Sequence, residues 1–278
     1  MKVTLKGQEL RLKRLSDPDY TRAESLAQMS GIPLDVCPTC GGKEEVIPDS
    51  GGVMDFKCGT FWYMGEENFC DCQAQIALRA RYLLANIGEQ YMRLDWSGYI
   101  GPDEVKESVG LYLARWQDFR INGMGLEFGG KGLGVGKTFA ATHIGKEMVK
   151  RGQNVFFIPF VEMISAYQSD NVRELEERIR TTTYVILDEL LPPQSDRQNQ
   201  FYATRLEAVI RHRTNYNLPT IITTNLDQNE LHKFYPRTYS LLAAKQLRID
   251  MSGEDARVGK IAEQNLELVA NGEVRPIT

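Results

Sequence analysis

A glycine-rich run that ends in a lysine and a threonine carries the clearest chemistry in this sequence. It occupies positions 129–138, follows a strand-like segment and leads into a helical pattern. Glycine lets the backbone turn so that successive N–H groups point at phosphate oxygens, at the positive end of the following helix. Lys137 would then bridge the β- and γ-phosphates of ATP, and the Thr138 hydroxyl would hold Mg²⁺. The residues predicted to bind the nucleotide are Gly132, Leu133, Gly134, Val135, Gly136, Lys137, Thr138 and Phe139.

This phosphate loop is irregular at its start. The strict G-x-x-x-x-G-K-[ST] spacing requires glycine at position 131, which is Lys131 here, with Gly130 and Gly132 on either side. The half that matters most chemically, Gly134 to Thr138, is intact. A glycine-rich turn without a ligand is the alternative, and the next motif argues against it.

The second motif is an apolar strand that ends in two acids. Residues 184–187 are followed by Asp188 and Glu189. We expect Asp188 to bind Mg²⁺ through water and Glu189 to polarise the attacking water as general base. Taken alone, the pattern is equally typical of a strand that runs into a solvated turn. Downstream of a phosphate loop, it indicates a nucleotide hydrolase.

A third strand-like run, 219–224, ends in Asn225. We expect this amide to reach between the two acids and the γ-phosphate and to help orient the attacking water. The alternative is a turn-forming asparagine at the end of a strand.

The elements that must position these motifs begin near residue 105. Strand-like runs are expected at 125–128, 154–160, 184–187 and 220–224, with helices between them, for example at 138–151 and 200–213. This alternation predicts an α/β domain with a parallel sheet.

The cysteines form a separate cluster of chemistry. All five lie between positions 37 and 72, and Cys37-Pro-Thr-Cys40-Gly has the spacing of a zinc knuckle. Zinc takes four ligands, so two of Cys58, Cys70 and Cys72 would complete a closed, structural site. Buried thiols without a metal and an iron–sulfur cluster are the alternatives.

Composition and charge limit the class of protein. The chain has 278 residues, is 42% hydrophobic and carries 33 basic and 37 acidic residues, a net charge of −4. Any binding to nucleic acid must therefore come from a local basic surface. No apolar run approaches a membrane span, and the start lacks a secretion signal. With an odd number of cysteines, the sequence favours a reducing, cytoplasmic setting and no membrane partner.

These patterns predict that the chain is divided into three parts. We expect a zinc-binding domain at 1–94, a linker rich in glycine and proline at 95–104, and an ATPase domain at 105–278. A single helix is expected from Ala74 to Tyr91, between the cysteines and the linker.

The three motifs, in this order and spacing, resemble the AAA+ ATPases of the DnaC/DnaI-like helicase-loader family, over roughly residues 100–260. The resemblance implies a P-loop AAA+ domain, a parallel sheet flanked by helices with a reduced C-terminal lid, after a small zinc-binding domain. It also implies an ATPase that loads a hexameric replicative helicase onto single-stranded DNA at replication initiation. Its subunits would self-associate into an oligomer or spiral on binding ATP. The cofactors implied are ATP, Mg²⁺ and Zn²⁺.

The resemblance also assigns cations and metal ligands. Within Gly253-Glu-Asp-Ala-Arg257, Arg257 looks like the arginine that contacts the γ-phosphate of its own subunit. Arg237 is the candidate for the arginine that acts on the neighbouring subunit's nucleotide, although Leu241 stands where the family usually has that arginine. A plain surface arginine at 237 is the alternative, with Arg211 and Arg213 as further candidates.

In the family's zinc domain a C-x-x-C pair is followed by a middle ligand and a late C-x-C. That pattern favours Cys37, Cys40, Cys58 and Cys70 as the ligands, with Cys72 beside the ion or as a substitute.

Two other functions stay open. An IstB-like transposition accessory ATPase would share the ATPase core, but that family generally lacks the cysteine module. A weakly hydrolysing nucleotide-binding adaptor is favoured slightly by the irregular loop and by Leu241, and disfavoured by intact Lys137, Asp188 and Glu189. Weak candidates for DNA contact are the basic residues within 205–213 and 245–248.

Overall fold

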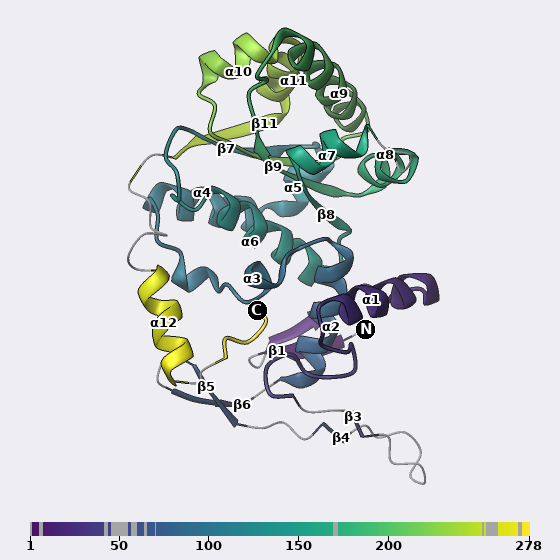
Figure 1. The fold of residues 1–278 in the computed structure, drawn as a ribbon, viewed down its shortest axis with the longest axis vertical. Helices are drawn as coiled ribbons and strands as arrows, with labels where there is room; N and C mark the ends of the chain where they lie inside the picture. Colours follow the sequence, from purple (N-terminus) through teal and green to yellow (C-terminus); the bar gives the residue numbers. More distant parts are fainter. Residues whose placement is uncertain are drawn as a thin grey trace. The chain divides into compact units, whose positions relative to one another are not determined.

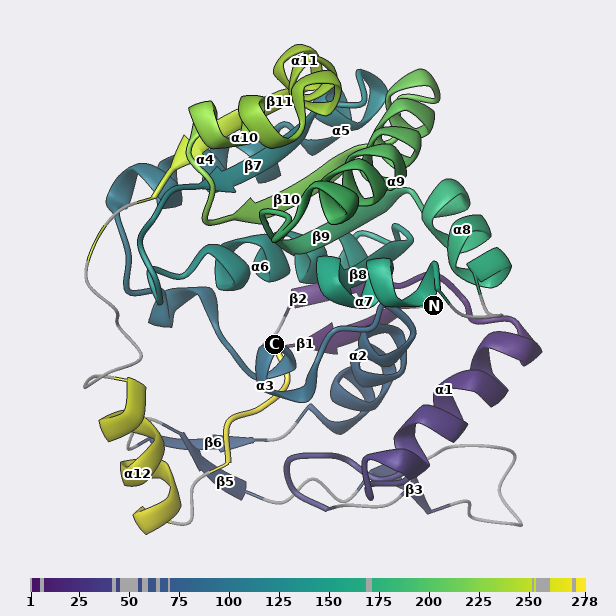
Figure 2. The same ribbon diagram turned by 45° about the horizontal axis from the view of Figure 1, so that its top comes forward.

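Five parallel strands form the central sheet of this computed structural model, in the order β11-β7-β10-β9-β8 (Figures 1 and 2). The structure describes residues 2–5, 8–41, 44–45, 55–56, 60–63, 66–69, 71–168, 172–251, 253, 261–271 and 274–278. The strands of the sheet are β7 (Gly125–Gly129), β8 (Val155–Pro159), β9 (Tyr184–Leu190), β10 (Thr220–Thr224) and β11 (Gln246–Asp250). The predicted parallel α/β fold is confirmed, and β11 is a strand that the sequence pattern did not reveal.

By their internal contacts, the residues group into two units. Unit 1 comprises residues 1–98, 148–153 and 258–278, and unit 2 comprises residues 99–147 and 154–257. The first boundary falls inside the expected linker. Residues 258–278, in contrast, group with the N-terminal part of the chain and not with the ATPase domain to which the sequence assigned them.

Helices cover both faces of the sheet in unit 2. Figures 1 and 2 show α9, α10 and α11 on one face and α4 and α6 on the other. The helices are α4 (Asp103–Ala114), α5 (Trp116–Ile121), α6 (Lys137–Lys150), α7 (Phe160–Ala166), α8 (Val172–Thr181), α9 (Asp196–Asn215), α10 (Gln228–Phe234) and α11 (Pro236–Lys245). Strands β7, β8, β9 and β10 are buried along nearly their whole length, as a parallel sheet between two helical layers requires, whereas the edge strand β11 is partly exposed.

Alternate residues of the strands build the two halves of this core. Phe156, Leu187 and Ile222 belong to a buried cluster with side chains of α7, α9, α10 and α11. On the opposite face α6 lies so close to β9 that a Cβ at Gly145 would come within 2.5 Å of the Ile186 side chain. Glycine in the middle of this helix is therefore explained by close packing.

Unit 1 is built from shorter elements. They are β1 (Lys2–Leu5), β2 (Gln8–Arg11), α1 (Asp17–Met29), β3 (Glu44–Glu45), β4 (Asp55–Phe56), β5 (Thr60–Tyr63), β6 (Glu66–Phe69), α2 (Cys72–Leu84), α3 (Glu89–Met92), a 3₁₀ turn at Trp96–Gly98 and α12 (Ala262–Asn271). The six strands form three antiparallel pairs. Helices α1 and α2 pack through small side chains, among them Ala23, Ala27 and Ala80.

The single helix expected from Ala74 to Tyr91 is wrong. Helix α2 ends at Leu84, and the chain turns before α3 begins at Glu89. Asn86 has a φ of 58°, in the left-handed region that ends a helix. No helix within the described residues is long and apolar enough to cross a membrane.

Candidate nucleotide and metal sites

The phosphate loop joins the end of β7 to the start of α6. Gly130, Gly134 and Gly136 have φ values of 119°, 63° and 90°, which L-residues rarely adopt. The Lys137 ammonium group is turned into this loop, where Nζ donates to the carbonyl oxygen of Gly130 at 2.9 Å and to that of Gly132. The loop therefore fits the triphosphate of a nucleotide, with its backbone turned by glycines and its cation held inside. Thr138 follows at the first turn of α6, where its hydroxyl could reach Mg²⁺.

The irregular start of the loop now has an explanation. Gly130 occupies the tight position, because a Cβ there would lie 2.5 Å from the carbonyl oxygen of Met251. Lys131 instead points outward, where Nζ lies 3.1 Å from Asp227 Oδ2 and 3.3 Å from Glu230 Oε1. These two acids form the capping box of α10, just after the Asn225 strand. Lys131 thus links the phosphate loop to the segment that follows β10.

An aromatic side chain from the expected linker closes one side of the loop. Tyr99 is 3% exposed, and a Cβ on Gly136 would come within 2.8 Å of its ring. Its ring centroid lies 5.8 Å from that of Phe139, the second residue after Lys137. Burial raises the pKa of the Tyr99 hydroxyl above its ordinary range, so it stays protonated.

The two acids lie at the carboxyl end of β9. Asp188 is buried, and its Oδ1 accepts a hydrogen bond of 2.6 Å from Thr223 Oγ1 of β10. Glu189 is exposed, has a φ of 56° and donates its backbone N–H to the same Thr223 oxygen at 2.8 Å. Thr223 is a site residue that the sequence analysis missed, because threonine within a strand is ordinary.

The strand order brings the three motifs together. β10 lies between β7, which leads into the phosphate loop, and β9, which carries the acids. All of these strands are parallel, so their carboxyl ends meet at one edge of the sheet. Asn225 directly follows β10 at this edge, between the loop and the acids. Arg257 lies outside the described residues, and its role stays a prediction.

A buried ion pair supports the loop from the neighbouring edge strand. Arg248 of β11 stands opposite Glu127 of β7 and pairs with its carboxylate, and it also donates to the carbonyl oxygen of Leu226 at 3.0 Å. A Cβ on Gly129 would collide with this guanidinium group. Burial raises the pKa of Glu127, and Arg248 opposes that shift.

The candidate trans-acting arginines differ sharply in their surroundings. Arg237 is 80% exposed and lies 3.6 Å from Glu207, and Arg211 is 53% exposed and lies 2.7 Å from the same carboxylate. Arg213, in contrast, is 1% exposed and donates five hydrogen bonds inside unit 2. Arg213 is therefore a structural residue, whereas Arg211 and Arg237 share one exposed place on the surface.

The weak candidates for DNA contact also have partners within unit 2. Arg205 lies over the rings of Tyr167 and Phe201, at 4.8 and 5.5 Å from their centroids. Lys245 donates to the Asn122 carbonyl oxygen at 2.8 Å. Arg248 pairs with Glu127, so each of these cations makes a contact within unit 2, and a role in DNA binding stays a prediction.

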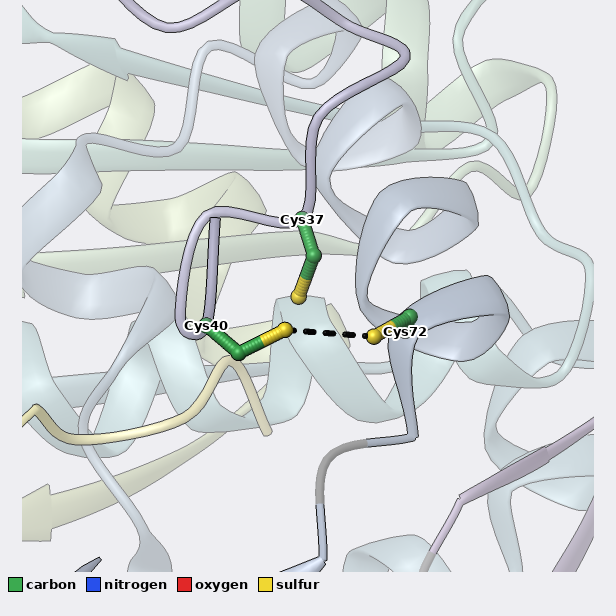
Figure 3. Close-up of side chains that lie close together, drawn as sticks. All are labelled: Cys37, Cys40 and Cys72. Atoms are coloured by element: carbon green, nitrogen blue, oxygen red, sulfur yellow. Dashed lines mark hydrogen bonds between the residues drawn. The ribbon is translucent and has the colours of Figure 1, made fainter. Parts of the chain in front are cut away.

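Three cysteines converge in unit 1 and fit a zinc ion. The sulfur atoms of Cys37, Cys40 and Cys72 all lie within 4.8 Å of one another (Figure 3). Figure 3 shows all three pointing inward, two from the knuckle and one from the start of α2. Zinc–sulfur bonds of about 2.3 Å in a tetrahedron place sulfurs about 3.8 Å apart, so the cluster offers three of four ligands. Gly41 has a φ of 70°, as a residue after the second cysteine of a knuckle should.

The structure places Cys72 beside the knuckle, with its sulfur 3.4 Å from that of Cys40. The sequence analysis favoured Cys58 and Cys70 as the remaining ligands, with Cys72 beside the ion or as a substitute. Cys58 and Cys70 lie outside the described residues, so that ligand set stays a prediction. Cys72 is in reach of the knuckle because it is the first residue of α2, which the C-x-C spacing does not reveal.

The side chains of buried Gln75 and half-buried Arg93 connect the knuckle to residues 274–278. The Gln75 side-chain oxygen accepts from Thr39 Oγ1 of the knuckle and, at 3.1 Å, from the backbone N–H of Ile277. Arg93 donates to the carbonyl oxygens of Pro38 at 2.8 Å and of Arg275 at 2.6 Å.

Residues 274–278 also make contacts at Ile277 and Thr278, the last two residues of this segment. Ile277 is fully buried, and the Thr278 carbonyl oxygen accepts a 2.8 Å bond from the Tyr82 hydroxyl. Residues 274–278 therefore form part of unit 1, beside the cysteine cluster.

Comparison with solved structures identifies the fold of unit 2. A crystal structure of DnaI matches with a TM-score of 0.50 and 19% identity, over 60% of this chain and 93% of that chain. A crystal structure of the DnaC helicase loader matches with a TM-score of 0.51 and 17% identity, over 59% of this chain and 100% of that chain. This is an AAA+ fold.

Domain III of the replication initiation protein DnaA from Thermotoga maritima is similar as well. Its TM-score is 0.50 and its identity 16%, over 67% of this chain and 77% of that chain. No family model matches the sequence, and no curated protein matches it. The resemblance to DnaC/DnaI-like AAA+ proteins is thus confirmed for the fold, on structural similarity alone.

Proposed function

We propose that this chain is an ATP-dependent loader of a hexameric replicative helicase onto single-stranded DNA during replication initiation. The observation that carries the proposal is the meeting of Lys137, Asp188 and Asn225 at one sheet edge, in a chain that also has a separate cysteine-bearing unit. The AAA+ ATPase unit would bind and hydrolyse ATP, and unit 1 would bind the helicase. The similarity to a solved helicase loader supports the choice among ATPases.

In this mechanism each residue acts at a defined place. The N–H groups of 132–138 bind phosphate oxygens, and Lys137 offsets charge between the β- and γ-phosphates. Mg²⁺, when bound, would stabilise negative charge on the same oxygens. Thr138 and Asp188 would hold it, the latter through water. Glu189 takes a proton from the attacking water as the bond to the γ-phosphorus forms and the bond to the leaving oxygen breaks.

Self-association would complete the site in the proposed loader. Arg237 and Arg211 stand on the surface beside Glu207 and are available to a neighbouring subunit's γ-phosphate. A cation supplied in trans would make hydrolysis depend on assembly, as an oligomer or spiral formed on ATP binding requires. Arg257 would act on the nucleotide of its own subunit. Single-stranded DNA would then be bound by several subunits together, because the net charge of one chain is −4.

The first test is biochemical and uses the full chain. Lys137→Ala should abolish ATP binding, because it removes the cation inside the loop. Glu189→Gln should keep ATP binding and slow hydrolysis by about 100-fold or more, because the general base is lost. Turnover of Glu189→Gln at the parent rate would show that the acid pair has been misassigned.

The second test separates the functional alternatives. A replicative helicase should be retained by the immobilised full chain, and the pair should unwind a strand coated with single-strand-binding protein in an ATP-dependent way. Retention without any hydrolysis would indicate a nucleotide-binding adaptor. ATPase activity with no helicase binding would point to a transposition-type ATPase and would refute the loader.

A further inference from the structure

β9 and β10 lose their regular register at the acid pair. Ile222 pairs with Leu187 and Thr224 pairs with Leu190, so β9 contains one more residue than β10 between these pairs. Glu189 accommodates the extra residue of β9 by adopting a left-handed backbone conformation, with a φ of 56°. A β-bulge of this kind re-aims side chains and leaves an N–H group without its ladder partner. A strained non-glycine residue persists only where its surroundings hold it in place.

The Thr223 hydroxyl provides that hold. Thr223 is 2% exposed and stands on β10 opposite the bulge. Its oxygen accepts the N–H of Glu189 at 2.8 Å, and its hydrogen is donated to Asp188 Oδ1 at 2.6 Å. A hydroxyl has one donor and two acceptor sites, so both bonds form at once. One side chain from the neighbouring strand therefore holds both acids.

We propose that Thr223 is a positioning residue for ATP hydrolysis, which sets the rotation of the Asp188 carboxylate and the backbone of Glu189. The inference rests on the proposed ATPase function. With its hydroxyl in place, the Asp188 carboxylate is oriented before Mg²⁺ arrives, and the exposed Glu189 side chain is kept at the sheet edge where water would attack. Without the hydroxyl, the N–H of Glu189 loses its partner and the bulge can relax toward regular pairing.

Two changes at this position separate the hydroxyl from the shape of the side chain. Thr223→Val keeps the branched shape and removes both hydrogen bonds, whereas Thr223→Ser keeps the hydroxyl. Thr142→Val is a matched control. Thr142 is a fully buried threonine of α6, and within the described residues its hydroxyl has no hydrogen-bond partner.

Hydrolysis and Mg²⁺ dependence are the decisive measurements on the full chain. For Thr223→Val we expect single-turnover hydrolysis to fall about 10- to 100-fold, as for other residues that orient metal-binding groups. The Mg²⁺ concentration for half-maximal activity should rise, while the affinity for a fluorescent ATP analogue without Mg²⁺ stays within about threefold of the parent. Thr223→Ser should recover most of the rate, and Thr142→Val should match the parent.

A double mutant tests whether Thr223 works through the general base. Thr223→Val should have a smaller effect on hydrolysis in a Glu189→Gln background than in the parent, because the part of its effect that passes through Glu189 is already lost and only the part through Asp188 remains. Additive effects would show that Thr223 does not act through Glu189.

Failure of this inference can be told from failure of the proposed function. If the parent hydrolyses ATP and Thr223→Val does so at the same rate and Mg²⁺ dependence, the positioning role is refuted while the ATPase stands. If the parent binds ATP without hydrolysing it, the ATPase proposal falls. In that case the positioning role of Thr223 is tested by two other measurements: the Mg²⁺ dependence of ATP-analogue binding, and hydrogen exchange in residues 184–190. If Thr223→Val equals the parent in both measurements, the inference is refuted.

Discussion

Replacing Arg213 with methionine should destabilise unit 2 far more than any change of a surface arginine. The side chain lies near the amino-terminal ends of β9 and β10, where it bonds to several segments of the chain. Its guanidinium group donates to Thr220 Oγ1 and to the carbonyl oxygens of Ile179, Thr182, Thr183 and Pro219. Burial lowers the pKa of Arg213 to about 9, so the group remains charged at neutral pH.

The expected loss in the free energy of unfolding follows from these five hydrogen bonds. Methionine fills much of the space but donates nothing, so four carbonyl oxygens lose a charged donor. A buried acceptor left without a partner costs about 1–3 kcal/mol. If water or a second donor reaches half of them, two remain, and the free energy of unfolding should fall by about 4 kcal/mol. For a domain of this size that corresponds to a drop of about 8–16 °C in the midpoint of thermal unfolding.

Arg211 supplies the matched control, two positions earlier on the same helix. It is 53% exposed and pairs with Glu207 at 2.7 Å. An exposed ion pair contributes about 0–1 kcal/mol, so Arg211→Met should move the midpoint by no more than about 4 °C. Calorimetry of the full chain, with hydrogen exchange in residues 218–224, reports on unit 2. If Arg213→Met unfolds within about 4 °C of Arg211→Met, the structural role given to Arg213 is wrong.

Three further outcomes are expected. The purified chain should carry about one zinc ion, and Cys72→Ser should release it to a chromophoric chelator, because Cys72 supplies one of four ligands. Deleting residues 274–278 should speed zinc release by about tenfold, since the knuckle loses hydrogen bonds made through Gln75 and Arg93. Mixing inactive Arg237→Ala and Lys137→Ala chains should restore hydrolysis, because each supplies what the other lacks across a subunit interface.

Each of these outcomes has a result that would contradict it. Full zinc retention by Cys72→Ser would remove Cys72 from the ligand set. Equal release rates for the parent and for the chain without residues 274–278 would show that the tail does not support the knuckle. Mixtures no more active than the separate variants would show that Arg237 does not act in trans, and Arg211→Ala would then be tested in its place.

The sequence was a good guide wherever the chemistry depends on local spacing. The run from Gly134 to Thr138 has few uses other than binding phosphate, and alternating helices and strands define a parallel sheet. The strand that carries Asp188 was predicted for the same reason. These features depend on neighbours in the chain, which a sequence displays directly.

The features that escaped prediction depend on residues distant in sequence. Thr223 matters because a bulge in another strand places an N–H and a carboxylate opposite it, and nothing in its own segment shows this. Lys131 looks like a defect in a motif until its ion pairs with Asp227 and Glu230 are known. Cys72 lies beside the knuckle cysteines because α2 starts there. In each case tertiary contacts decide the role of a residue whose type is unremarkable.

The grouping of residues 274–278 with unit 1 has a consequence for synthesis on the ribosome. Domains generally fold as they emerge, the N-terminal one first. Here the knuckle with Cys37 and Cys40 emerges early, but the backbone groups that meet Gln75 and Arg93 follow only after the whole of unit 2 has been made. At about 5–20 residues per second the wait is of the order of ten seconds or more. We therefore expect unit 2 to fold first, and the cysteines of unit 1 to reach their final packing only when the chain is complete.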